Sequence, residues 1–174
     1  MHPLAEAIRN VPDFPKKGIV FRDITTLLKD AKALKRSVDI LAEHYQSSRI
    51  DKVVGIESRG FVLGGALAVR LNAGFVPVRK KGKLPAETVR EEYALEYGTD
   101  VVEIHKDAVQ RSDRILLHDD LLATGGTMLA AIKLVEKLGG TIVGVSFLIE
   151  LSFLKGRSRL EKHDVFSIIQ YDAE

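Results

Sequence analysis

Hydrophobic positions along this chain follow two periods that alternate. Short runs of aliphatic and β-branched residues, typical of buried strands, are separated by segments in which apolar residues recur every three to four positions, typical of helices. The runs that predict strands cover residues 52–56, 74–79, 114–118, 141–149 and 164–170. The segments that predict helices cover residues 4–9, 31–46, 60–71 and 127–138. Strands that alternate with helices indicate an α/β fold, in which helices cover both faces of a mostly parallel central sheet.

Two segments interrupt this alternation. Residues 11–22 contain Pro12, Pro15 and Gly18, so we expect an irregular arm there. Residues 80–104 are dense in charges and are interrupted by glycine and proline, which predicts a long excursion built as a β-hairpin flap. In open α/β sheets, ligands bind beyond the carboxyl ends of the strands, where the strand order switches. We therefore expect the functional residues to follow the strands.

Length and composition favour a single domain, residues 1–174, with 45% hydrophobic and 29% charged residues. The net charge of +2 is small for a nucleic-acid-binding domain, so we expect no nucleic acid as a partner. The absence of cysteine excludes disulfides, thiolate metal sites and cysteine nucleophiles. The chain has no signal-type N-terminus and no apolar run near the roughly 20 residues of a membrane span. We expect a cytoplasmic protein without a membrane partner.

The most informative segment is residues 115–127, Ile-Leu-Leu-His-Asp-Asp-Leu-Leu-Ala-Thr-Gly-Gly-Thr. An apolar strand delivers two adjacent carboxylates, Asp119 and Asp120, to its end, and a turn with two glycines follows before a helix begins. The backbone N–H groups at a helix start lack helical partners, and the helix dipole adds positive charge there, so such a turn suits a phosphate group. No lysine follows Gly126 as in a P-loop, and the Gly-x-Gly-x-x-Gly dinucleotide pattern is absent.

The two acids need a partner other than the phosphate, which would repel them. The hydroxyls of a ribose donate hydrogen bonds to carboxylates. A ribosyl carbon that becomes cationic during bond breaking is also stabilised by nearby negative charge. Acids beside a phosphate-binding turn therefore indicate a sugar phosphate that reacts at its anomeric carbon.

This segment closely resembles the motif with which type I phosphoribosyltransferases bind phosphoribosyl pyrophosphate (PRPP), and its Asp-Asp-Leu-Leu-Ala-Thr-Gly-Gly-Thr form is similar to the adenine-specific branch. The resemblance implies that Asp119 and Asp120 are catalytic and face the ribose hydroxyls. It implies that the 5′-phosphate is bound by Ala123, Thr124, Gly125, Gly126 and Thr127. His118 stands where the family usually has an aliphatic residue, and we expect it to be a packed, hydrogen-bonded histidine.

The N-terminal arm, residues 1–30, resembles the base-binding segment of the same family. The resemblance implies that backbone groups of Val20 and Arg22 read the edge of adenine, whose amino group donates and whose N1 accepts hydrogen bonds. It also implies that Phe21 and Leu121 pack on opposite faces of the base. Taken alone, the segment is more typical of a proline-punctuated arm with a buried phenylalanine, and only the other motifs favour the base-binding role.

Residues that follow the first two predicted strands match the family's pyrophosphate site. The resemblance implies that pyrophosphate is bound by Ser58, Arg59, Arg79, Lys80 and Lys83. Guanidinium groups in particular match phosphate oxygens. Taken alone, Ser58 is also typical of a helix N-cap, and the basic cluster is also typical of a solvated loop. In the family Arg79 is expected to reach the site of a neighbouring subunit, which implies a homodimer.

Residues 82–104 resemble the flexible flap of the family. Glu96 matches the family's candidate acid near adenine N7 and is expected to be catalytic. Tyr97 is expected to help cover the ribosyl centre. An ordinary surface position is the alternative for both residues.

Together the resemblance implies transfer of the 5-phosphoribosyl group of PRPP to N9 of adenine, with AMP and pyrophosphate as products, in purine salvage. Mg²⁺ is expected to arrive on PRPP rather than on protein ligands, because it prefers substrate oxygens and water. Two alternatives stay open. One is the same reaction on hypoxanthine or xanthine, against which the N-terminal arm argues. The other is a non-catalytic PRPP-sensing regulator, which usually carries a DNA-binding domain for which this chain has no spare length.

Overall fold

The computed structural model describes residues 2–94 and 98–173. Its strands are β1 (Arg9–Pro12), β2 (Val20–Asp23), β3 (Lys52–Ile56), β4 (Gly74–Lys80), β5 (Thr88–Ala94), β6 (Thr99–His105), β7 (Arg114–Leu122), β8 (Thr141–Leu151) and β9 (Val165–Tyr171). Its α-helices are α1 (Thr25–Leu28), α2 (Ala31–Tyr45), α3 (Gly60–Arg70) and α4 (Gly126–Leu138). Short 3₁₀ helices are η1 (Pro3–Ala7), η2 (Ser152–Leu154) and η3 (Gly156–Leu160).

The central sheet of the described chain has the strand order β5-β6-β4-β3-β7-β8-β9. The five strands from β4 to β9 in this order run parallel, whereas β6 is antiparallel to both β4 and β5. The predicted α/β fold with a mostly parallel sheet is therefore confirmed. The strand order reverses between β3 and β7, so the carboxyl ends of these two strands mark the place where a ligand is expected.

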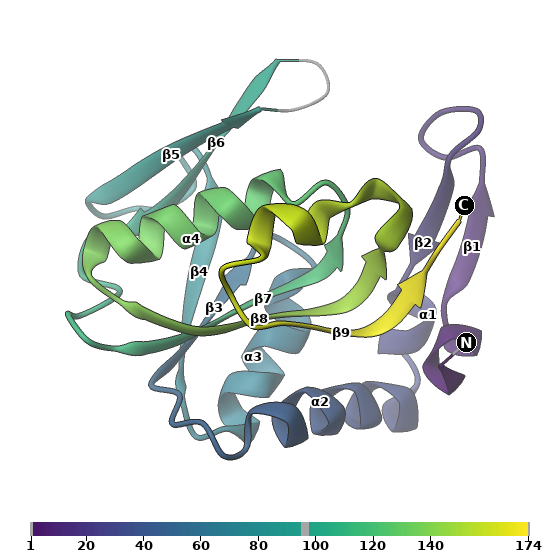
Figure 1. Cartoon of the computed structure of the whole chain (residues 1–174), viewed down its shortest axis with the longest axis horizontal. Helices are drawn as coiled ribbons and strands as arrows, with labels where there is room; N and C mark the ends of the chain where they lie inside the picture. Colours follow the sequence, from purple (N-terminus) through teal and green to yellow (C-terminus); the bar gives the residue numbers. More distant parts are fainter. Residues whose placement is uncertain (1, 95–97, 174) are drawn as a thin grey trace.

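Helices cover both faces of the sheet (Figure 1), with α4 on one face and α2 and α3 on the other. Along β7, Leu116 packs on the side of α2 and α3, whereas Ile115 and Leu117 pack on the side of α4. Both faces of this strand are buried, which explains why its sequence is a continuous apolar run rather than an alternating one. The β5–β6 hairpin and the β1–β2 pair extend on either side of the sheet end in Figure 1.

The helix α2 shows how local sequence sets its bounds. The carboxylate of Asp30 accepts hydrogen bonds from the backbone N–H groups of Lys32 and Ala33 at 2.8 and 2.9 Å, which caps the first turn. Leu41 and Tyr45, four residues apart, are buried on the face that packs against the sheet and α3. The predicted helix over residues 31–46 is confirmed to within one residue.

Two predictions for the N-terminal arm are wrong. Residues 11–22 are not irregular throughout, because β1 and β2 pair as an antiparallel hairpin with Val11 opposite Phe21. The prolines and Gly18 occupy the turn of this hairpin and its ends, where they are compatible with strand pairing. The helix predicted over residues 4–9 is instead the short 3₁₀ helix η1, which ends at Ala7 because the chain then enters β1.

The strand predicted over residues 114–118 is also longer than expected. It continues to Leu122, because Asp119 and Leu121 still pair with Phe147 and Ile149 of β8. The two acids therefore lie within the last part of β7 rather than after it. The predicted hairpin in the flap is confirmed by the antiparallel pairing of β5 and β6.

Candidate active site

Asp119 and Asp120 lie at the carboxyl end of β7, next to the residues that follow β3. The Nε of Arg59 lies 2.8 Å from Oδ2 of Asp120, and Oδ1 of Asp119 accepts a hydrogen bond from the backbone N–H of Asp120 at 2.8 Å. Burial raises the pKa of Asp119, and the charge of Asp120 raises it further. Burial also raises the pKa of Asp120, but Arg59 opposes this rise. The negative charge of the pair is therefore held most readily on Asp120.

Residues 123–127 form the tight turn that the sequence predicts. Gly125 has a φ of 80°, in the left-handed region that favours glycine, and α4 begins at Gly126 without a side-chain cap. Thr124 and Thr127 line a small hollow of about 80 Å³ here, which Asp119 also borders. The first backbone N–H groups of α4 thus face a space beside the carboxylates, as a phosphate site requires.

The segment from η2 to η3 packs directly beneath this turn, and the sequence analysis assigned it no chemistry. A Cβ on Gly156 would lie only 2.1 Å from the carbonyl oxygen of Ala123, so only glycine fits there. The next residue, Arg157, donates two hydrogen bonds to the carboxylate of Glu150, at 2.9 and 2.5 Å. This ion pair between a half-buried arginine and a buried glutamate anchors the segment against β8 and β9. The Gly-Arg dipeptide was the available signal, but a glycine in a turn has many ordinary explanations.

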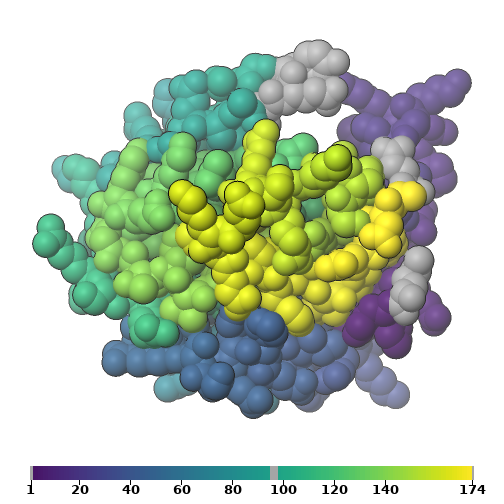
Figure 2. Space-filling model, in the orientation of Figure 1, coloured from purple at the N-terminus to yellow at the C-terminus, as the bar shows by residue number. Residues whose placement is uncertain are grey.

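A larger pocket of about 630 Å³ opens above the turn and is lined by several parts of the chain. The N-terminal arm contributes Val20 and Arg22, the flap contributes Tyr93, and the end of β8 contributes Leu151. Thr124, Gly126 and Thr127 border both this pocket and the smaller hollow. Figure 2 shows the surface hollowed between the teal hairpin and the purple arm.

Within the described residues, β2 of the N-terminal arm is paired on one edge only, with β1. Val20 and Arg22 are two residues apart, so their backbone groups point to the same edge of β2. The side chain of Arg22 is occupied elsewhere, because it donates to Oδ1 of Asn10 at 2.6 Å and its guanidinium carbon lies 4.0 Å from the ring centre of Tyr171. The side chain of Arg22 is thus fixed by contacts within the chain, and the role of its backbone stays a prediction.

The apolar residues predicted for the base lie in different places. Phe21 meets Phe14 edge-on with ring centres 5.2 Å apart. Leu121 borders the small hollow at the phosphate turn, whereas Leu151, which the sequence analysis missed, borders the larger pocket with Val20. The role of Leu121 stays a prediction, and Leu151 is a second candidate for the same role. Both leucines come directly after an acidic residue near the carboxyl end of a strand, so the sequence alone does not separate them.

Arg59 connects the carboxylates to the arm, because its guanidinium carbon lies 5.1 Å from the ring centre of Phe21. Arg59 also occupies the N-cap position of α3, and no side chain caps this helix. The alternative explanation of Ser58 as a helix N-cap is therefore wrong. The structure places Ser58 between β3 and α3, at the switch in strand order, where its predicted pyrophosphate role stays untested.

Two of the predicted pyrophosphate cations, Arg79 and Lys83, converge on the carboxylate of Glu57, for which no role was predicted. Arg79 Nη2 and Lys83 Nζ lie 3.1 and 2.7 Å from Oε1 of Glu57, and the backbone N–H of Lys80 donates to Oε2 at 3.1 Å. Burial disfavours ionisation of Glu57, but these hydrogen bonds outweigh it and lower its pKa to about 2. Arg79 is thus held within its own chain, and the cations form an ordered cluster.

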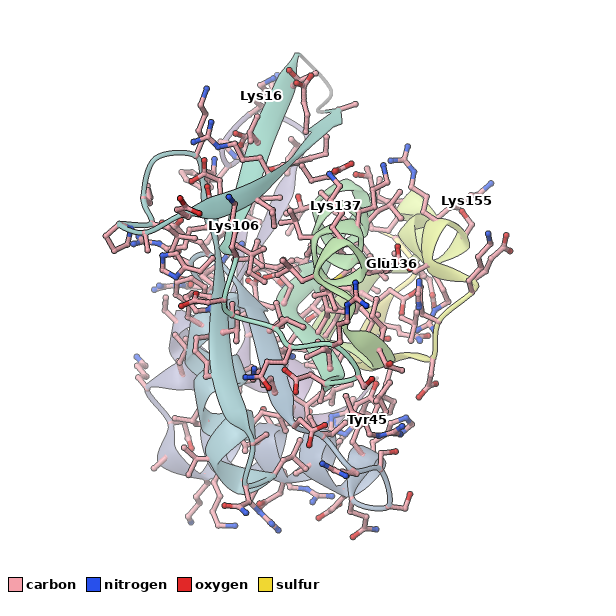
Figure 3. All side chains as sticks on the ribbon, turned by 90° about the vertical axis from the view of Figure 1, so that its left-hand side faces the viewer. Lys16, Tyr45, Lys106, Glu136, Lys137 and Lys155 are labelled. Atoms are coloured by element: carbon pink, nitrogen blue, oxygen red, sulfur yellow. The ribbon has the colours of Figure 1, made fainter. Side chains whose placement is uncertain are left out.

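The side chain of Lys80 points to the flap instead. Its Nζ lies 3.1 Å from Oδ2 of Asp100, to which the hydroxyl of Tyr93 also donates, at 3.2 Å. Lys137 of α4 donates to the carbonyl oxygen of Arg90 at 3.1 Å and points toward the hairpin in Figure 3. These contacts hold the β5–β6 hairpin over α4. Glu96 and Tyr97 lie outside the described residues.

His118 is fully buried in the sheet, as expected of a core histidine. The hydroxyl of Ser146 donates to the carbonyl oxygen of Leu117 at 3.2 Å and lies 3.0 Å from Nδ1 of His118. Nδ1 therefore carries the proton, and Nε2 has no hydrogen-bond partner among the described residues. Burial lowers the pKa of His118 to about 4, so this residue is neutral near pH 7.

Comparisons with known proteins agree with this geometry. The phosphoribosyl transferase domain family matches residues 23–173. The adenine phosphoribosyltransferase of Acidobacterium capsulatum is 62% identical over 97% of this chain and 93% of that protein. The crystal structure of adenine phosphoribosyltransferase from Thermoanaerobacter pseudethanolicus has 55% identity and a TM-score of 0.94, over 97% of this chain and 98% of that one. The crystal structure of the Giardia lamblia enzyme complexed with 9-deazaadenine has 42% identity and a TM-score of 0.91, over 97% of this chain and 96% of that one.

A strand that carries two acids near its carboxyl end and leads into a glycine turn at a helix start is typical of the site of a phosphoribosyltransferase. The chain belongs to the phosphoribosyltransferase family, and within it to the adenine phosphoribosyltransferases. In the described part of the chain, no helix is long and apolar enough to cross a membrane.

Proposed function

We propose that this chain transfers the 5-phosphoribosyl group of PRPP to N9 of adenine, giving AMP and pyrophosphate, as an enzyme of purine salvage. One observation carries the proposal. The larger pocket bordered by the base-binding arm and the small hollow bordered by Asp119 share the residues of the phosphate turn. A base, a ribose and a 5′-phosphate thus have adjoining places in one site. Relatives named adenine phosphoribosyltransferase, one of them bound to an adenine analogue, support the same substrates.

The acids act on the ribose. With the 5′-phosphate on residues 123–127, Asp119 and Asp120 accept hydrogen bonds from the ribose hydroxyls. As the bond from the anomeric carbon to the pyrophosphate oxygen breaks, positive charge develops on that carbon, and the negative charge of the acid pair, held most readily on Asp120, stabilises it. N9 of adenine then bonds to the anomeric carbon, and the proton of the base leaves. Arg59 keeps Asp120 charged for this step.

The leaving pyrophosphate meets the cations. Arg79, Lys80 and Lys83 bind its oxygens together with Ser58 and Arg59, since guanidinium and ammonium groups form charge-assisted hydrogen bonds to phosphate. In the described part of the chain, no three His, Asp or Glu side chains gather as a metal-binding group. Magnesium bound to PRPP would add to the charge neutralisation that these cations provide for the pyrophosphate oxygens.

The base site uses backbone groups of Val20 and Arg22 for the edge of adenine, with Phe21 and Leu121 predicted on its faces. The flap closes over the ribosyl centre and excludes water that would hydrolyse it. Within the flap, Glu96 exchanges the proton at adenine N7 and Tyr97 covers the reacting carbon. These two roles, and the cytoplasmic location, stay predictions.

We also propose a homodimer. Val62 and Val69 on α3 are 46% and 83% exposed, and Phe75 on β4 is 36% exposed, which supports an apolar surface for a second copy of the chain. The predicted role of Arg79 in a neighbouring site needs it to exchange its own-chain partner, Glu57. The molar mass measured by light scattering tests this proposal, and a purely monomeric mass contradicts it.

The test of the proposed function is pyrophosphate release from PRPP and Mg²⁺ with each purine base. Adenine is expected to exceed hypoxanthine and xanthine by about 10²-fold or more, because a base with the wrong edge leaves buried backbone groups unpaired. Equal turnover of adenine and hypoxanthine contradicts the base assignment. Tight PRPP binding without release on any base instead favours a non-catalytic regulator.

A further inference from the structure

An arginine that the reaction scheme does not use lies beside the phosphate turn. Arg159 belongs to η3, the short helix that contacts α4 and whose first residue, Gly156, abuts the turn. Its Nη1 lies 3.8 Å from the position of a Cβ on Gly126, the first residue of α4. Arg159 also lines the larger pocket, together with Thr124 and Thr127. The guanidinium is therefore within reach of a group bound at the start of α4.

The charges around Arg159 favour the binding of an anion. Arg159 forms no hydrogen bond or ion pair within the residues that the structure describes, whereas Arg157, two positions earlier, is tied to Glu150. The N-terminal end of α4 is itself positive, so it repels the guanidinium unless a negative group lies between them. Among the described residues that line the pocket, the charged ones are Arg22 and Arg159, and Arg22 is already bound to Asn10.

We infer that Arg159 binds the 5′-phosphate of PRPP and AMP from the side opposite the carboxylates. This inference rests on the proposed function, because it takes the turn at residues 123–127 as the phosphate site. The backbone N–H groups of the turn and the hydroxyls of Thr124 and Thr127 hold the phosphate at the helix end. Arg159 adds a charged donor that recognises the dianion and distinguishes a phosphorylated ligand from a nucleoside.

The chain offers a matched control for this inference. Lys155 lies in the same segment and carries the same charge, but it does not line the pocket, and it points away from the phosphate turn in Figure 3. Lys155→Gln therefore removes one positive charge from this segment without removing the contact. Arg159→Lys keeps the charge but gives up the planar donor pair.

The experiment measures AMP and adenosine binding by calorimetry in the wild type, Arg159→Gln, Arg159→Lys and Lys155→Gln. Arg159→Gln is expected to weaken AMP binding roughly tenfold, with adenosine unchanged, because one charge-assisted contact to the phosphate is lost. The Kd of AMP for Arg159→Lys is expected to lie between those for the wild type and Arg159→Gln. The Kd of AMP for Lys155→Gln is expected to match that of the wild type. The KM for PRPP should rise with the Kd of AMP, and the KM for adenine should stay constant.

The outcomes separate this inference from the proposed function. If Arg159→Gln retains the full preference of the wild type for AMP over adenosine, the role of Arg159 is refuted and the proposed function stands. Equal weakening of both ligands also refutes it, because that result indicates a general effect on packing. If the wild type itself binds AMP no more tightly than adenosine, the phosphate turn is wrongly placed, and both fail.

Discussion

Replacing Gly156 with alanine tests whether the η3 segment positions the phosphate turn. The new Cβ would lie 2.1 Å from the carbonyl oxygen of Ala123 and 3.0 Å from the backbone nitrogen of Gly125. An ordinary carbon–oxygen contact is about 3.3 Å, so the turn must move by roughly 1 Å. Gly156 is not among the residues with positive φ, so the cost is steric rather than a matter of backbone strain.

A displacement of this size has two measurable effects. A misplacement of about 1 Å in a substrate-positioning group costs up to about 10²-fold in rate, so kcat/KM for PRPP is expected to fall by roughly that factor. Forcing an extra carbon into a packed site costs about 1–3 kcal/mol of unfolding free energy. Each kcal/mol lowers the Tm of a domain of this size by about 2–4 °C. Steady-state pyrophosphate release and thermal unfolding measure the two effects.

Gly65 provides the control. A Cβ on this α3 residue meets no atom within 4 Å, so Gly65→Ala should keep wild-type activity and hold or raise the Tm. If Gly156→Ala keeps the wild-type KM for PRPP, kcat and Tm, the segment does not position the phosphate turn.

Three further changes test other parts of the site. Changing Asp119 and Asp120 together to asparagine should lower kcat by about 10²-fold or more at unchanged Tm, and undiminished turnover contradicts their ribose-facing role. Of Leu151→Ala and Leu121→Ala, the one that raises the KM for adenine roughly tenfold identifies the side chain on the base, and no change in either refutes both assignments. The pKa of His118 is lowered from 6.5 to about 4 in the folded chain. Between these two pH values the unfolded chain binds a proton at His118 and the folded chain does not, so the free energy of unfolding falls as the pH drops from 6.5 towards 4. Urea unfolding should show that the free energy of unfolding of His118→Leu falls by about 2 kcal/mol less than that of the wild type between pH 7 and pH 5. Equal decreases in the two proteins contradict the buried, neutral state of His118.

The part of the site that was predictable from sequence is the part that is contiguous in sequence. Residues 115–127 hold a strand, two acids, a glycine turn and a helix start in one stretch, and each has a local physical signature. The alternation of predicted strands with predicted helices likewise indicated the sheet. The strands were recognisable because parallel strands that are buried on both faces form continuous apolar runs. The structure differs here only in extending β7 through the acids, which the pairing with β8 brings about.

The residues that escaped prediction depend on contacts between distant segments. Gly156 is special only because Ala123 lies against it, and nothing near Gly156 in sequence indicates this. The hairpin of β1 and β2 depends on pairing across a turn rich in proline and glycine, which resembles irregular chain when read locally. Leu151 is the last residue of β8 and Leu121 the last but one of β7, and which of them faces the larger pocket depends on the three-dimensional course of the two strand ends.

The carboxylate of Glu57 has a thermodynamic consequence for substrate and product. Arg79 and Lys83 already share an ion pair with the single carboxylate of Glu57 when no ligand is bound, so an arriving pyrophosphate group gains only the difference between new ion pairs and old ones. The same carboxylate recaptures both cations when pyrophosphate departs. The exchange of Arg79 and Lys83 between Glu57 and pyrophosphate therefore lowers the affinity of the site for pyrophosphate. A lower affinity favours release of pyrophosphate after the reaction.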